Sequence, residues 1–208
     1  MVIIVKFFGV KIMSSEKRDP AQTANEIPYL PRNRWKALVR REGDIIIKDY
    51  SASPPGARFY GRICIAWEAS ALERLRGLPG IPLVLERPGP YTLKMTAVPG
   101  QPISKMKKGD LSEAYFSRLV ALFEQMHTRG VAHGDAHHRN ILVHNELPYL
   151  VDFSTAYVRG RLPVLDHTIF KWFVLLDLER LYKVEKKFFG RGTPPKMFFL
   201  YRIAKRLS

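Results

Sequence analysis

The spacing of apolar residues changes along the chain. The first half contains short apolar runs typical of β-strands, and these predict strands over residues 35–39, 44–50, 83–85 and 91–97. A helix is predicted between the two pairs of strands, over residues 62–76, because Gly77 and Pro79 end its apolar repeat. The segment 51–56 before it contains Pro54-Pro55 and is predicted as a loop.

The second half is richer in helical patterns. Five apolar residues recur at intervals of three or four and predict a helix over residues 111–129: Leu111, Tyr115, Leu119, Leu122 and Met126. Two short strands are predicted at 141–143 and 149–151, and a largely helical end from about residue 165. We therefore predict an α+β protein with an irregular lead-in (1–30), a small β-rich N-lobe (31–98) and a short helical C-lobe (99–208), joined near Pro99-Gly100.

The composition is that of a globular protein in a reducing compartment. Hydrophobic residues make up 46% and charged residues 25% of the 208 residues, which excludes wholesale disorder. The single cysteine, Cys64, excludes an internal disulfide framework and a cysteine-rich zinc module. The lack of disulfides fits a cytoplasmic location. We predict that Cys64 itself is a small core residue.

The chain is strongly basic, with 34 Lys+Arg against 19 Asp+Glu and a formal net charge of +15. Such an excess favours a phosphate-rich partner such as nucleic acid, anionic lipid headgroups or a phosphorylated saccharide. Surface lysines that only keep the protein soluble would give the same count.

The ends of the chain raise the question of a membrane. The apolar stretch at residues 1–13 is broken by Lys6 and Lys11, is too short to span a bilayer and lacks a cleavage-site pattern. From Phe188 onward, aromatic residues alternate with lysines and arginines. This pattern fits a peripheral contact with a membrane, and equally a terminal segment that covers its own core.

The most informative residues lie at 133–143 and 149–154. His133-Gly134-Asp135 is followed five residues later by Asn140, and Asp152-Phe153 comes after the two predicted strands. These residues resemble the protein-kinase-like superfamily, in the branch that has His-Gly-Asp in its catalytic loop. The resemblance is strongest to lipopolysaccharide-core (Kdo/WaaP-type) kinases, with RIO and Bud32 kinases as near relatives.

The resemblance implies a two-lobed kinase-like fold and a role for each matching residue. Asp135 would be the catalytic base, Asn140 and Asp152 would hold Mg²⁺ (or Mn²⁺), and His133 and Phe153 would pack beneath the loop. A zinc site built from the histidines around Asp135 would leave Asn140 and the Val-Asp-Phe hairpin unexplained. We expect His137 and His138 to face solvent.

The same fold needs a strand lysine paired with a helix glutamate. Lys48 ends an apolar strand and is predicted to bind ATP. Glu68 lies in the middle of the apolar face of the following helix, whereas Glu73 points about 140° away. A buried carboxylate is costly without a cation, so we predict that Lys48 meets Glu68 and that Glu73 is a surface charge.

Residues 91–100 resemble the hinge that holds adenine, with Met95 guarding the pocket and the backbones of Thr96 and Val98 contacting the base. A strand followed by a Pro-Gly turn explains the same residues without a ligand. No glycine-rich loop precedes Lys48; Arg32-Asn33-Arg34-Trp35 stands in its place. There is no Ala-Pro-Glu segment, and Ser154 replaces the glycine of Asp-Phe-Gly.

The sequence thus predicts an enzyme that transfers phosphate from ATP to a hydroxyl. The resemblance implies that the acceptor is a lipopolysaccharide-core sugar, met at the cytoplasmic face of the inner membrane by a protein peripherally bound through its C-terminal tail. One alternative is a RIO/Bud32-like serine/threonine protein kinase. Another is an inactive kinase-like scaffold that binds polyanions; nucleic acid is not an expected partner of the enzyme.

Overall fold

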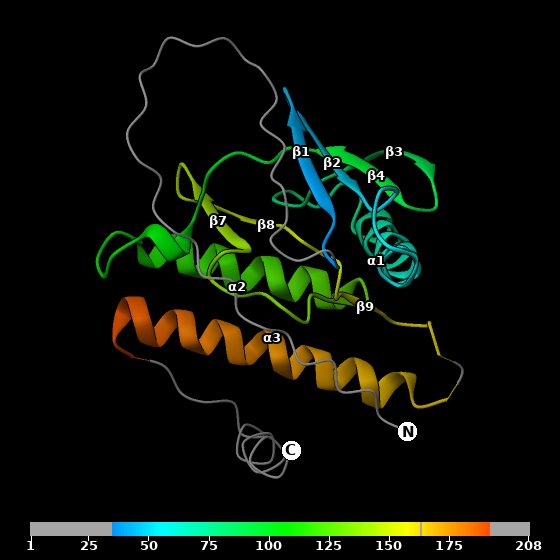
Figure 1. Ribbon diagram of the computed structural model, residues 1–208. Helices are drawn as coiled ribbons and strands as arrows, with labels where there is room; N and C mark the ends of the chain where they lie inside the picture. Colours follow the sequence, from blue (N-terminus) through cyan, green and yellow to red (C-terminus); the bar gives the residue numbers. More distant parts are fainter. Residues whose placement is uncertain (1–34, 163, 192–208) are drawn as a thin grey trace, which may run out of the picture.

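The N-terminal lobe is an antiparallel sheet with one helix against it (Figure 1). The structure is a computed structural model that describes residues 35–162 and 164–191. The sheet has the strand order β1-β2-β4-β3. Its elements are β1 (Leu38–Glu42), β2 (Ile45–Asp49), α1 (Pro55–Arg74), β3 (Val84–Gly89) and β4 (Thr92–Thr96). The predicted lead-in, residues 1–30, and the segment Arg32-Asn33-Arg34 lie outside the described residues.

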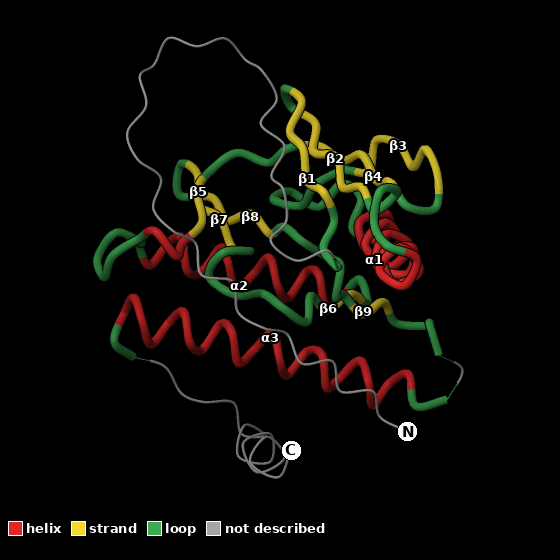
Figure 2. Tube along the Cα trace, viewed as in Figure 1, coloured by secondary structure: helices red, strands yellow, loops and turns green. Residues whose placement is uncertain are grey.

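The C-terminal lobe consists of two long helices and several short strands (Figure 2). The helices are α2 (Glu113–Thr128) and α3 (Asp166–Phe189), and a 3₁₀ turn, η1, covers Ile103–Lys105. The strands are β5 (Gln101–Pro102), β6 (Val131–Ala132), β7 (Ile141–His144), β8 (Leu147–Leu150) and β9 (Tyr157–Val158). β5, β7 and β8 form one sheet and β6 pairs with β9, so the loop between β6 and β7 is held at both ends.

Helix α1 begins at Pro55, seven residues before the predicted start. The Pro-Pro pair was expected to extend a loop, but proline suits the first turn of a helix because its φ is already helical and no N–H is needed there. The buried side of α1 includes Cys64, as predicted, and Glu68. Gly61 lets the helix approach the end of β2 closely, since a Cβ there would lie 2.2 Å from the ring of Tyr50.

Helix α2 follows the predicted repeat closely. Ser112 caps it by accepting a hydrogen bond from the backbone N–H of Tyr115 at 3.0 Å. The repeat residues Tyr115, Leu119, Leu122 and Met126 are all buried, which confirms the apolar face deduced from their spacing.

Helix α3 buries the beginning of the aromatic C-terminal tail. Phe188 is only 2% exposed, and the ring of Phe189 lies 5.3 Å from that of Phe116 on α2. These two residues of the tail pack against the protein's own core. The rest of the predicted membrane-contacting tail, residues 192–208, lies outside the described residues.

The two lobes are joined at the ends of α1 and α2. The Arg129 Nη1 group donates hydrogen bonds to the carbonyls of Leu75 (3.2 Å) and Arg76 (3.0 Å), and Leu150 N donates to Gly80 O at 2.9 Å. One hydrophobic core runs through both lobes. Because the core is continuous, the division of the chain after residue 98 stays a prediction.

None of the helices in the described part of the chain is both long and apolar enough to cross a membrane.

Candidate active site

Lys48 on β2 lies at the centre of a three-residue charge cluster. Its Nζ is 2.7 Å and 2.9 Å from the two carboxylate oxygens of Glu68, and 2.8 Å from Asp152 Oδ1. Glu68 is 1% exposed on α1, so the ion pair deduced from its place on the apolar face is present. Glu73, in contrast, is exposed and pairs with Arg76, as predicted for a surface charge.

Lys48 and Asp152 keep their charges at neutral pH. Burial alone would lower the pKa of Lys48, but the nearby charges of Asp152 and Glu68 raise this pKa overall. The Lys48 cation in turn holds the pKa of Asp152 well below its usual range. Burial, together with the charge of Asp152, raises the pKa of Glu68, although Lys48 acts in the opposite direction. Asp152 is therefore available as an anionic ligand.

The segment after β8 presents Asp152 through a strained backbone. Asp152 has φ +66°, in the left-handed region, and its Oδ1 accepts a hydrogen bond from Ser154 Oγ at 2.8 Å. Phe153 N donates to Glu68 Oε1 at 3.1 Å. The serine that replaces the usual glycine therefore helps to orient the carboxylate.

His133 and Phe153 pack together below the loop between β6 and β7, as the resemblance implies. Both are fully buried, and their ring centroids are 4.6 Å apart. His133 also bonds to Val151 O through Nε2 at 3.0 Å. This contact ties the loop that carries Asp135 to the strand that leads to Asp152.

The loop between β6 and β7 holds Asp135 and Asn140 together. Asn140 Nδ2 donates to Asp135 O at 3.0 Å, which leaves the amide oxygen of Asn140 for another partner. Gly134 has φ +77°, and a Cβ there would lie 2.8 Å from Phe173 and 3.0 Å from Thr155 O. A larger residue at this position would be strained and would have to displace Phe173. The Asp135 carboxylate itself is partly open, with 32% of its side chain exposed.

Asp177 on α3 supports this loop and was not found by sequence reasoning. It is fully buried, and its carboxylate accepts from His133 N (2.8 Å) and Gly134 N (2.9 Å) and bonds His127 Nε2 (2.9 Å). A signal was present, since Asp177 falls within the apolar repeat Phe170, Val174, Leu181, Val184 and Phe188. The reasoning that identified Glu68 as a buried carboxylate applies equally to it.

The expectation that His137 and His138 face solvent was wrong. Both are half-buried, and the Nδ1 atom of His137 is buried without a hydrogen-bond partner among the described residues. The ring of His138 lies 6.5 Å from that of Phe188, because α3 runs directly under the loop. Burial and nearby positive charges lower the pKa of His138.

The hinge residues lie at the end of β4. Met95 is 3% exposed and pairs with Ile46 of β2 and Val84 of β3. Thr96 N donates to Leu83 O at 2.9 Å, so the N–H of Thr96 is already bonded. Val98, in the connection to the second lobe, is half-buried. The roles given to these three residues stay predictions.

Asn140 and Asp152 are suited to bind a cation whose remaining ligands are supplied by phosphate oxygens and water. Within residues 35–162 and 164–191, no cluster of three or more His, Cys, Asp or Glu side chains could hold a metal by itself. Mg²⁺ differs from zinc in this respect, since it is commonly bound by one or two protein oxygens together with phosphate oxygens and water. A carboxylate kept ionised and an amide oxygen left available are suitable donors of this kind.

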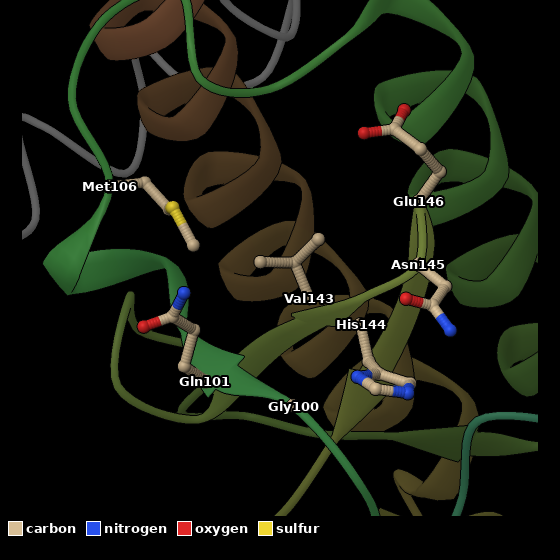
Figure 3. Close-up of a pocket in the computed structure, with 7 residues that line it drawn as sticks. All are labelled: Gly100, Gln101, Met106, Val143, His144, Asn145 and Glu146. Atoms are coloured by element: carbon tan, nitrogen blue, oxygen red, sulfur yellow. The ribbon is translucent and has the colours of Figure 1, made fainter.

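A separate hollow of about 520 Å³ lies beside β5 and the β7–β8 turn (Figure 3). Its lining consists of Gly100, Gln101, Met106, Val143, His144, Asn145 and Glu146. It contains none of the predicted site residues. We therefore treat it as distinct from the candidate active site.

Comparison with solved structures identifies the fold. Two structures of the Rio2 kinase from Chaetomium thermophilum match 76% of this chain. The ADP/Mg²⁺-phosphoaspartate complex has a TM-score of 0.57, 15% identity and 54% of its chain covered. The other structure has a TM-score of 0.59, 17% identity and 56% coverage.

Curated relatives match shorter segments, and no family model matches the chain. Probable bifunctional tRNA threonylcarbamoyladenosine biosynthesis proteins are 31% identical over 105 residues in Methanosarcina mazei and 37% identical over 67 residues in Methanosarcina barkeri. The matched segments span 18% and 12% of those proteins, and 49% and 32% of this chain. Together with the architecture described above, the structural matches show that this chain has a protein-kinase-like fold, with a β-sheet N-lobe and a helical C-lobe.

Proposed function

We propose that the protein is a Mg²⁺- and ATP-dependent kinase that phosphorylates hydroxyl groups of proteins, as a RIO/Bud32-like serine/threonine kinase. The observation that carries the proposal is the contact of Lys48 with both Glu68 and Asp152. A lysine fixed by a buried glutamate and a metal-binding aspartate is the arrangement that kinase-like phosphoryl transfer requires.

Each site residue has a role in this proposal. Lys48, oriented by Glu68, would bind the phosphates of ATP, and Asn140 and Asp152 would hold Mg²⁺. The metal supplies positive charge that neutralises the phosphates. The acceptor oxygen forms a bond to the γ-phosphorus while the bond from that phosphorus to the bridging oxygen of ADP breaks, and Asp135 accepts the hydroxyl proton.

The adenine base would lie against the hinge. Met95 would close the inner end of its pocket. The N–H of Thr96 is already bonded to Leu83 O, so its carbonyl is the backbone group that would meet the base. This carbonyl would accept a hydrogen bond from the adenine amino group. The N–H of Val98 would donate to a ring nitrogen.

A protein acceptor has better support than a lipopolysaccharide-core sugar. The sequence resemblance led us to expect the sugar, but the matching structures are Rio2 kinases and none of the matches reported above is a sugar kinase. The glycolipid acceptor and the membrane contact therefore lack support, and we propose a cytoplasmic reaction on protein.

The test uses the full-length protein, γ-labelled ATP, Mg²⁺ and a dephosphorylated cell extract. Protein and glycolipid fractions are separated and counted, and Asp135→Asn is run in parallel. We expect label on serine or threonine of protein, reduced by roughly 100-fold or more in the variant.

Two other results would contradict the proposal. Asp135-dependent label confined to glycolipid would establish a sugar kinase instead. An absence of label, with Mg²⁺–ATP binding intact by calorimetry, would indicate an inactive scaffold.

A further inference from the structure

Helix α3, which packs under the loop between β6 and β7, carries three cationic side chains on one side. Arg180, Lys183 and Lys187 are spaced i, i+3 and i+7, which places them on one side of the helix. We call these three residues the α3 cation row. The opposite side of α3 carries Lys171, about 160–180° around the helix from Arg180 and Lys187.

The row borders the proposed catalytic base. Arg180 Nη2 lies 3.5 Å from Asp135 Oδ1. Lys187 lies over the ring of Phe188, and that ring is 6.5 Å from His138 in the same loop. An acceptor that presents its hydroxyl to Asp135 would therefore have the row beside it.

The row is only partly neutralised. Lys183 pairs with Glu179 at 2.5 Å, and Arg180 faces Asp135. Lys187 forms no ion pair within the described part of the chain, and its Nζ lies 4.6 Å from the ring centroid of Phe188. Lys187, which has no ion pair among the described residues and lies on the same side of the helix as Arg180, favours an anionic group on an acceptor that is bound at Asp135.

We propose that the α3 cation row binds acidic side chains of the acceptor protein, close in sequence to the hydroxyl that is phosphorylated. This inference rests on the proposed function and names its substrate class, acidic peptide segments. Arg180 and Lys187 are about 10 Å apart along the helix axis. An extended peptide covers that length in roughly three residues, so the acidic positions fall within about three or four residues of the target hydroxyl.

The surroundings of the row favour a peptide over a single-stranded nucleic acid. Proteins that bind single strands combine cations with accessible aromatic rings on which bases stack. The aromatic ring beside Lys187 belongs to Phe188, which is only 2% exposed. The carboxylates of an acidic peptide can bind to the cations alone and do not need an exposed aromatic ring.

The test is direct peptide binding, which does not depend on turnover. Fluorescently labelled peptides with one serine and acidic, neutral or basic flanks are titrated with the full-length protein at 0.15 M salt, and anisotropy is recorded. We expect the acidic peptide to bind at least tenfold more tightly than the neutral one. Lys187→Glu should remove that preference, and Lys187→Gln should weaken it.

Lys171→Glu is the matched control, since it makes the same charge change on the far side of the same helix. It should leave acidic-peptide binding within twofold of the wild-type value. Thermal melts of all variants check that the fold is kept.

The inference is overturned if acidic and neutral peptides bind alike, or if Lys171→Glu weakens binding as much as Lys187→Glu. It is also overturned if a single-stranded RNA, and not the acidic peptide, binds through Lys187. The proposed function fails separately: an acidic peptide that binds through Lys187 but is never phosphorylated supports the row and contradicts the kinase. Phosphorylation of peptides without preference for acidic flanks supports the kinase and contradicts the role proposed for the row.

Discussion

Lys48 Nζ and Asp152 Oδ1 are 2.8 Å apart although 104 residues separate them in the chain. The contact links the N-terminal sheet to the segment that follows β8, and it lies where the phosphates of ATP are proposed to bind. An incoming nucleotide must therefore share Lys48 with Asp152, whose negative charge then becomes available to a cation.

Replacing Lys48 with methionine should weaken Mg²⁺–ATP binding by at least tenfold, because a charged hydrogen-bond donor to phosphate is lost. Isothermal titration calorimetry measures the affinity. Lys94→Met is the control, since Lys94 is also a strand lysine but pairs with Glu86. Equal affinity in the wild type and Lys48→Met would contradict the phosphate-binding role.

Replacing Asp177 with asparagine should lower the free energy of unfolding by about 2 kcal/mol and reduce phosphoryl transfer. The carboxylate accepts two backbone N–H groups, and an asparagine would turn an N–H donor toward one of them. Denaturant unfolding and initial rates measure the two effects. Glu124→Gln, on the exposed side of α2, controls for the loss of a carboxylate. Unchanged stability would mean that the loop is held by other contacts.

Alanine at Gly134 and at Gly160 separates backbone strain from steric conflict. Both glycines have positive φ, but a Cβ at Gly160 meets no atom within 4 Å, whereas one at Gly134 meets Phe173 and Thr155. We expect Gly160→Ala to cost about 1–2 kcal/mol of stability, and Gly134→Ala to cost more and to slow transfer by displacing Asp135. Chemical denaturation and steady-state rates supply the comparison. Equal costs would show that Phe173 moves aside freely.

The stability of the protein should fall on acidification partly because of His138. Its pKa in the folded protein is lowered by burial and by Lys187, Arg180, His137 and Lys183. The unfolded chain therefore takes up the proton first, near pH 6.5, and stability present above that pH is lost as the pH falls toward the folded-state pKa.

We expect His138→Gln to lose less stability than the wild type between pH 7 and pH 5, measured by thermal unfolding. His144→Gln, which removes an exposed histidine, is measured beside it. An identical pH dependence in His138→Gln and the wild type would contradict the assignment.

The long elements and the Lys48–Glu68 contact could be predicted because each depends on a regular pattern. The repeat in α2 and the position of Glu68 on an apolar helix face are local properties of the sequence. The hairpins of the N-terminal sheet follow from short apolar runs separated by turn residues.

Other features depend on contacts that no local pattern reports. β5, β6 and β9 each contain two residues, too few for any alternation to be visible. His137 and His138 resemble loop residues in the sequence and become half-buried only because α3 packs under them. Asp177 could have been found from its place in the apolar repeat of α3. The motifs, however, suggested a partner for only one buried carboxylate, that of Glu68.

The bonds that Arg129 forms to Leu75 and Arg76, and the bond from Leu150 to Gly80, have a consequence for how the protein comes apart. They connect the end of α1 to α2 and β8, on top of a hydrophobic core that both lobes share. Neither lobe can lose its structure without exposing apolar surface of the other. The backbone amides in the last turns of α1 and α2 should therefore exchange with deuterium together, as one cooperative unit, and the protein should melt in a single transition.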